Sequence, residues 1–298
     1  MSLWIILTGL IIGIISPALA VCFIVPAAGR VCIEDNTSRY KFFIIWYLVF
    51  SILYLLKFID IVQAVSLMLG AGLSCILLFN MIKNEYSLSQ ILMALLFHNT
   101  AFIVLRQYFY SSIINENYLA SVEKTIEYLS SNFQISPEQY SVFLDLMSMS
   151  SELYLKYNPG IWIATMLSCL IMGYYLLTIM NKSVSSLILY QTHRHVIYSF
   201  VLALAITVLT VKYRVITTNY LIATVPLFFL QGLSVFKYKI GHWFRKYKFL
   251  IIVAILMMVL NPYTILFISV IGLADNWFDF RNLSKPEAIN EDHNDRDN

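Results

Sequence analysis

Long apolar stretches recur along almost the whole chain and constrain its fold more than any other feature. Several of them reach about 18 residues or more, the length at which a helix crosses roughly 30 Å of hydrocarbon. Hydrophobic residues make up 59% of the 298 positions and charged residues only 12%, whereas an average soluble domain carries about 25% charged residues. The sequence therefore predicts an all-α, polytopic membrane bundle of 6 to 8 transmembrane helices with a helical extracytoplasmic insertion.

We expect a single membrane domain over residues 1–283, followed by a disordered polar tail over 284–298. The insertion lies at 115–158 and is the only sizeable hydrophilic stretch within this domain. Within it, Ser136-Pro137-Glu138-Gln139 is a strong helix start, with an N-cap serine and a proline in the first turn. Apolar residues recur at helical spacing on both sides of this start, so two short helices are expected to lie on the membrane surface or to cap the bundle.

Four further features set the expected boundaries of the membrane segments. Ser16-Pro17 interrupts the apolar run at 3–28, and Asn261-Pro262 interrupts the run at 249–273. Because proline removes an intrahelical hydrogen bond, each run is either one kinked spanning helix or a re-entrant pair of half-helices. Residues 30–41 are expected to form a loop, and Asn158-Pro159-Gly160 is expected to end the insertion.

The loop at 237–248 contains five Lys or Arg residues interleaved with aromatic residues. This pattern favours a cytoplasmic location, where the aromatic rings lie at headgroup level. Alternation of the spans then places eleven basic loop residues inside the cell and five outside. The acidic insertion is also placed outside. The inside set includes Arg30, Arg39, Lys41, Lys83, Lys182 and Arg194, and the outside set is Lys57, Lys124, Lys156, Lys212 and Arg214. We expect a multi-pass protein of the bacterial inner membrane, with the lipid bilayer as its main partner and a cytoplasmic or envelope protein as a further candidate.

Six residues are candidates for ligand or interhelical polar contacts. Asn99 and Arg106 lie seven positions apart in the apolar run at 88–114, and therefore on one helical face. A charged group at membrane depth is expensive, so Arg106 either orients a buried anionic or polar group, or snorkels or forms a structural ion pair. Gln231 is expected to hydrogen-bond across helices beside Gly232. Asp275, Asp279 and Arg281 are expected to pair and fix the chain end.

The sequence contains no catalytic or cofactor motif, so an enzyme is not expected. Its four cysteines are scattered and mostly lie in apolar runs, which predicts neither a disulfide framework nor a metal site. His193 and His195 point apart in a helix and are poor metal ligands. The net charge of +3 gives no support to nucleic-acid binding, because the positive charge lies in loops where membrane topology explains it.

Two C-terminal segments carry a family resemblance. The segment from Phe229 to Val235 contains Leu230-Gln231-Gly232, and the segment from Gly272 to Arg281 follows the proline-broken run. Together they resemble the YybS-like family of bacterial membrane proteins. The specific resemblance covers roughly 55 residues, from Phe229 to Arg281. The resemblance implies no catalytic residues, since the family has no established activity. Its layout is distantly similar to the substrate-binding components of energy-coupling-factor transporters, by analogy and not by motif.

These patterns favour a non-enzymatic, transport-related membrane component that binds a small solute or a lipid within its bundle. The polar span at 88–114, the two proline-broken runs and the basic loop support this hypothesis. A cell-envelope scaffold, in which the insertion and the C-terminal end bind other proteins, is the alternative.

Overall fold

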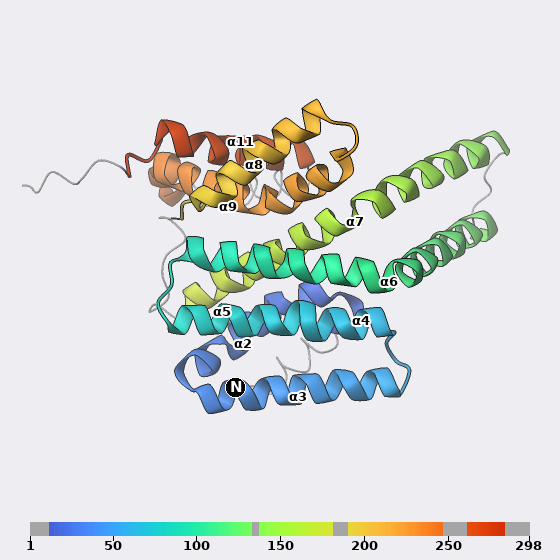
Figure 1. The fold of residues 1–298 in the computed structure, drawn as a ribbon, viewed down its shortest axis with the longest axis horizontal. Coiled ribbons are helices and arrows are strands. Elements are labelled where there is room, and N and C mark those ends of the chain that lie inside the picture. Colours follow the sequence, from blue (N-terminus) through green and yellow to red (C-terminus); the bar gives the residue numbers. More distant parts are fainter. Residues whose placement is uncertain (1–11, 133–136, 181–189, 247–260, 284–298) are drawn as a thin grey trace, which may run out of the picture. The chain divides into compact units, whose positions relative to one another are not determined.

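The structure is a computed structural model that describes residues 12–132, 137–180, 190–246 and 261–283. Every regular element in these ranges is helical (Figure 1). Five helices there are long and apolar enough to cross a membrane, and three shorter helices are also apolar. These helices confirm the all-α, polytopic membrane fold. The tail at 284–298 lies outside the described residues.

The chain divides into two compact units. Unit 1 comprises residues 1–187 and 193–226, and unit 2 comprises residues 188–192 and 227–298. Whether residues 1–283 behave as one membrane domain stays a prediction.

A single residue, Asp35, connects helices α2 and α3 of unit 1. Helix α2 (Pro17–Glu34) begins at the expected proline, with Ser16 as its N-cap. The prediction of a loop over 30–41 was wrong, because α2 continues to Glu34 and α3 (Asn36–Leu55) begins two residues later. Asp35 makes this sharp turn favourable: its carboxylate accepts hydrogen bonds from the backbone N–H groups of Thr37 and Ser38, each at 2.9 Å.

Helix α2 is the centre of unit 1. Ala20, Val21, Val25 and Ala28 are completely buried. Their small side chains allow α2 to pack closely against α7 (Pro137–Met180), where a Cβ on Gly173 would lie 2.9 Å from the Cβ of Val25. Close approach through small residues is the usual way in which helices associate in lipid, so the proline-broken first run supplies the core of the bundle.

The next span contains a π-helical segment that the sequence did not predict. Helix α4 (Ile61–Val65), the π-helix η1 (Ser66–Gly72) and α5 (Leu73–Lys83) follow one another without a break. Side chains from neighbouring helices contact three successive carbonyls of this segment: Trp46 Nε1 and Tyr47 Oη donate to Leu67 O and Met68 O, and His98 Nε2 lies 3.2 Å from Leu69 O. These contacts satisfy carbonyls that the wider π-turn leaves exposed.

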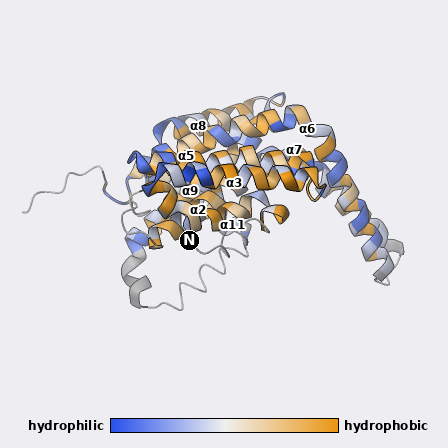
Figure 2. Ribbon diagram, turned by 90° about the horizontal axis from the view of Figure 1, so that it is seen from below, coloured by the Kyte–Doolittle hydropathy of each residue, from blue (hydrophilic) through white to orange (hydrophobic). Residues whose placement is uncertain are grey.

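The insertion is built differently from its prediction. Helix α6 (Leu88–Asn132) is 45 residues long and α7 is 44 residues long, so each continues from the bundle into the region 115–158. This region is therefore an antiparallel hairpin that extends beyond the other helices of unit 1 and carries many hydrophilic residues (Figures 1 and 2). Tyr118 stacks on Tyr154 across the hairpin, with ring centroids 4.3 Å apart.

Asn158-Pro159-Gly160 does not end a helix, because Asn219 repairs the break. Asn219 lies on α9 (Arg214–Lys246). Its Oδ1 accepts a hydrogen bond from Gly160 N at 2.7 Å, and its Nδ2 donates to Lys156 O at 3.1 Å. In an unbroken helix these two backbone groups would bond to each other. The side-chain amide of Asn219 therefore holds α7 together across its proline.

The remaining helices are α8 (Arg194–Leu209) and α11 (Pro262–Phe278). In unit 1, α8 faces the first half of α9, and Thr207 Oγ1 donates to Thr217 Oγ1 at 2.6 Å. Helix α11 begins at Pro262 with Asn261 as its N-cap, so the last apolar run breaks where the sequence predicts. The first half of that run lies outside the described residues, so kinked and re-entrant paths stay open.

Candidate functional site

Two glycines bring the helices of unit 2 into backbone contact. A Cβ on Gly232 of α9 would lie 2.1 Å from Ile268 O, and a Cβ on Gly272 of α11 would lie 2.0 Å from Phe228 O. Only glycine permits so close an approach. Because the two helices touch here, the side chains next to Gly232 reach directly across to α11.

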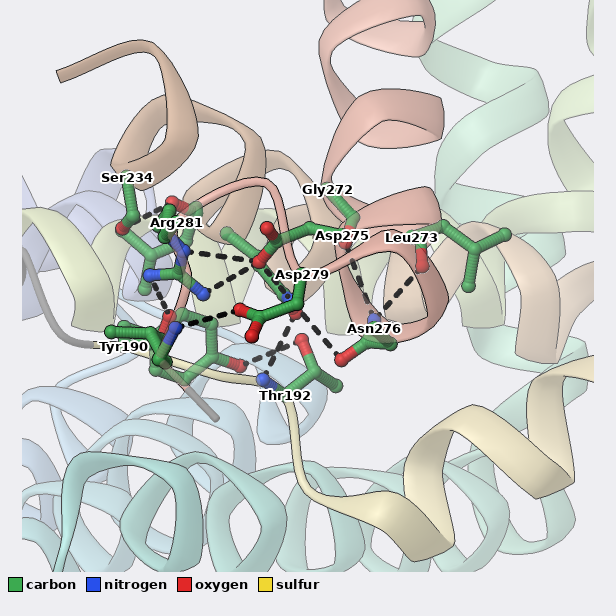
Figure 3. A network of polar contacts seen from close by, with 12 residues as sticks. Tyr190, Thr192, Ser234, Gly272, Leu273, Asp275, Asn276, Asp279 and Arg281 are labelled. Atoms are coloured by element: carbon green, nitrogen blue, oxygen red, sulfur yellow. Dashed lines mark hydrogen bonds and ion pairs between the residues drawn. The ribbon is translucent and has the colours of Figure 1, made fainter. Parts of the chain in front are cut away.

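Gln231 uses both ends of its amide at this crossing, and its partners Thr192, Asp275 and Asn276 are labelled in Figure 3. It is completely buried, and its Nε2 donates to Asp275 Oδ2 at 3.0 Å and to Asn276 Oδ1 at 3.1 Å. Its Oε1 accepts from the backbone N–H of Thr192 at 3.0 Å. Gln231 thus forms the interhelical contact that its sequence position suggests, and it also ties down the segment before α8.

Arg281 returns to the same carboxylate after the end of α11. Its Nε and Nη2 donate to Asp275 Oδ2 at 3.0 and 2.7 Å, and its Nη1 donates to Tyr190 O at 2.8 Å. The return is possible because Asp279 ends the helix in the left-handed conformation, with φ of 43°. Asp279 also accepts a hydrogen bond from Leu283 N at 2.8 Å.

The resulting cluster of Gln231, Asp275, Arg281 and Tyr190 is buried. The side chains of Asp275 and Arg281 are 2% and 1% exposed, and burial raises the pKa of the Tyr190 phenol. Asp275 Oδ1 is the one atom of this ion pair that is buried without a hydrogen-bond partner in the described structure. The geometry of this cluster fits a structural role: it fixes the end of α11 to α9 and to the segment at 190–192.

The other candidate region surrounds Arg106 on α6, in unit 1. The Nε and Nη1 atoms of Arg106 are buried and have no hydrogen-bond partner among the described residues. The guanidinium carbon lies 5.9 Å from the centre of the Trp162 ring, and Trp162 packs against Phe102 with ring centroids 5.2 Å apart. The next residue, Gln107, has a buried Oε1 that is also without a partner in the described structure.

No carboxylate among the described residues forms an ion pair with Arg106. Asp60 attracts the guanidinium electrostatically. However, the Asp60 carboxylate is used elsewhere: Oδ1 accepts from Gln63 N at 2.7 Å and Oδ2 accepts from Asn117 Nδ2 at 3.2 Å. Among the described residues, the Arg106 guanidinium therefore lies beside an aromatic face but has no ion-pair partner.

Asn99 does not join Arg106, although both lie on α6. It is completely buried, and its Nδ2 donates to Ser74 Oγ on α5 at 3.2 Å and to Leu95 O at 2.8 Å. Asn99 thus forms an interhelical hydrogen bond, whereas Nε and Nη1 of Arg106 form no hydrogen bond with a described residue.

Trp162 was not among the residues expected near Arg106. A tryptophan 56 positions further along the chain gives no local signal that the two side chains are close.

Taken together, the spanning helices and the polar groups buried between them define a polytopic helical membrane protein. The chain belongs to the DUF2232 family of predicted membrane proteins, whose family model matches residues 3–276. This match covers nearly the whole chain and so extends far beyond the C-terminal segments discussed above. No curated protein and no solved structure matches the chain.

Proposed function

We propose that this protein is a non-enzymatic, transport-related component of the bacterial inner membrane that binds an anionic solute or lipid at Arg106. The observation that supports this proposal is that two guanidinium nitrogens of Arg106, Nε and Nη1, are buried without a hydrogen-bond partner among the described residues. Buried polar groups are nearly always hydrogen-bonded, and an unpaired buried charge costs more than an unpaired neutral group. An anion bound at Arg106 would supply the missing acceptor.

The surroundings of Arg106 favour an amphiphile over a small inorganic anion. Trp162 and Phe102 form an aromatic wall beside the guanidinium. Four apolar side chains of α6 near Arg106 are largely exposed, namely Val104, Leu105, Tyr108 and Phe109. A ligand with an anionic head and an apolar body would use both features, since arginine binds carboxylate and phosphate well and the exposed side chains would cover an acyl or ring system.

The layout likeness to the substrate-binding components of energy-coupling-factor transporters agrees with this proposal. Such a component would not energise transport by itself, because the chain contains no nucleotide-binding loop. A separate ATPase would have to supply the energy.

Native mass spectrometry of the protein purified in mild detergent tests the proposal. The expected result is a bound species of fixed mass on the wild type that is absent from Arg106→Gln. Arg214→Gln is the matched control, because it removes the same charge from an exposed position. A wild type without bound species, or an Arg106→Gln variant that retains it, would refute the proposal.

A stability measurement separates ligand binding from a structural role of Arg106. If Arg106 serves a ligand, Arg106→Leu should not destabilise the delipidated protein, because it removes an unpaired buried charge. A large loss of stability in the delipidated variant would instead show that Arg106 holds the bundle together.

An envelope scaffold is the second candidate function, and one surface of the hairpin favours it. Val142, Leu146, Met149 and Leu153 of α7 are 46 to 62% exposed and follow the 4-3-4 spacing of a coiled-coil seam. Exposed carboxylates of Asp145 and Glu152 lie beside this stripe. The stripe therefore fits an amphipathic helix with a basic flank, from a partner protein outside the cytoplasm.

Cysteine cross-linking in whole cells tests the scaffold. A cysteine at Met149 should capture a partner, and the capture should be lost when Leu146 and Leu153 are changed to Ser. A cysteine at Glu127, an exposed position on α6, is the control. Equal capture at both positions, or capture that the serine variant retains, would refute specific docking.

A further inference from the structure

A pair of cations, Arg39 and Lys83, lies where α3 begins and α5 ends, in unit 1. Arg39 Nη2 and Lys83 Nζ both donate to the same neutral oxygen, Asn36 Oδ1, the lysine at 2.8 Å. Arg39 Nη1 donates to Asn80 Oδ1 at 3.1 Å. Two positive side chains from different helices thus converge on side-chain amides.

Neither cation has a negative partner within the described residues. Arg39 is only 4% exposed, and its Nε is buried without a hydrogen-bond partner. Asp35 lies nearby in sequence, but its carboxylate accepts from Thr37 N, Ser38 N and the Ser38 hydroxyl. Neither Arg39 nor Lys83 therefore forms an ion pair with a residue that the structure describes.

An anion is the partner that this arrangement lacks. Like charges that share one acceptor repel each other, and a neutral amide oxygen does not cancel either charge. A desolvated guanidinium is stable only when it is paired and hydrogen-bonded. A phosphate group offers several oxygen acceptors, enough for the free Nε of Arg39 and the remaining donors of Lys83 together.

We propose that Arg39 and Lys83 bind a phosphate group, with Asn36 and Asn80 positioning the two cations. The site is separate from the one around Arg106 and uses none of its residues. The charge distribution of the loops predicts that Arg39 and Lys83 are on the cytoplasmic side, where the leaflet carries anionic headgroups. The phosphate belongs either to such a headgroup or to a free or solute-borne phosphate.

The experiment measures the thermal unfolding midpoint of the full-length protein in neutral detergent. One arm adds phosphatidylglycerol, with phosphatidylcholine as the uncharged lipid control. The other arm adds inorganic phosphate, with chloride at equal ionic strength. Lys83→Gln is the test variant, because Lys83 is exposed and its loss leaves the packing intact. Lys41→Gln is the control, since it removes an exposed lysine two positions from Arg39.

A lipid-dependent rise of the midpoint in the wild type and in Lys41→Gln, with roughly fivefold more lipid needed in Lys83→Gln, supports the headgroup as the source. The same pattern with inorganic phosphate supports a free or solute-borne phosphate. No rise with either addition, or the same dependence in Lys83→Gln as in the wild type, overturns the proposal. Arg106→Gln should retain the rise, so this test is independent of the proposed function.

Discussion

Arg281 Nη2 lies 2.7 Å from Asp275 Oδ2, and both side chains are almost completely buried. The pair joins Arg281, three positions beyond the end of α11, to the last turn of that helix. Gln231 of α9 donates to the same carboxylate. The pair therefore lies at the crossing of α9 and α11 and links their polar side chains.

Arg281→Ala should therefore destabilise the protein strongly. The substitution leaves a buried carboxylate without its counter-ion, which typically costs about 3–5 kcal/mol. Arg214→Ala removes an exposed arginine and should cost less than about 1 kcal/mol. Reversible unfolding in detergent measures both variants. Equal losses would show that the Asp275–Arg281 pair adds nothing beyond a surface charge.

Gly272→Ala tests the close approach of α9 and α11. A Cβ at Gly272 would meet Phe228 O at 2.0 Å and Gly232 N at 2.5 Å, both of them backbone atoms that have little freedom to move. Overpacking of this kind costs about 1–3 kcal/mol or more. Gly72→Ala is the control, because its Cβ would find no atom nearer than 3.3 Å. A Gly272→Ala variant as stable as Gly72→Ala would place the two helices further apart than described.

Asn219→Ala should weaken α7 at its proline. Gly160 N and Lys156 O lose the amide that bonds to each of them. The bond to the part-buried Gly160 N is the costlier of the two, because leaving a buried donor without an acceptor costs about 1–3 kcal/mol. Hydrogen exchange should therefore rise in α7 around residue 160. Asn117→Ala removes an exposed amide from α6 and should leave that exchange unchanged; equal exchange in the two variants would contradict the bridging role.

A feature of the fold or of the candidate site can be predicted from the sequence when the residues that cause it lie close together in the chain. The helical class, the breaks at Pro17 and Pro262 and the pairing of Asp275 with Arg281 follow from composition or from residues within a turn or two of each other. The contact between Gly232 and Gly272 joins positions 40 apart, and the Asn219 bridge joins positions 59 apart. Nothing near either position in the sequence indicates its partner.

The end of the insertion shows that a distant contact can also overrule a strong local signal. Pro159 and Gly160 are strong local signals for the end of a helix, yet α7 continues because a distant asparagine satisfies the freed backbone groups. The site around Arg106 is intermediate: the arginine stands out in the sequence, whereas Trp162 and the absence of a nearby carboxylate partner emerge only in the described fold.

The turn between α2 and α3 should respond to pH through Asp35. Hydrogen bonds from the Ser38 hydroxyl and from the backbone N–H groups of Thr37 and Ser38 hold the pKa of Asp35 below its ordinary value. A lowered folded-state pKa contributes stability above the unfolded pKa of about 4, and this contribution is lost as the pH falls through the folded-state pKa. Asp35→Asn keeps an N-cap but does not titrate.

The difference in unfolding free energy between wild type and Asp35→Asn should thus be constant above about pH 5 and should shrink as the pH falls below about 4. Unfolding titrations at a series of pH values measure it. Parallel curves over the whole acidic range would show that the Asp35 cap does not contribute.

The most direct test of the proposed function is an experimental density map of the protein in a lipid nanodisc, viewed at Arg106. The proposal predicts non-protein density for an anionic group within hydrogen-bond distance of Nε or Nη1, with an apolar body along Val104, Leu105 and Tyr108. Density that shows Arg106 paired with Asp60 or with another carboxylate of the chain, and no ligand beside it, would contradict the proposal.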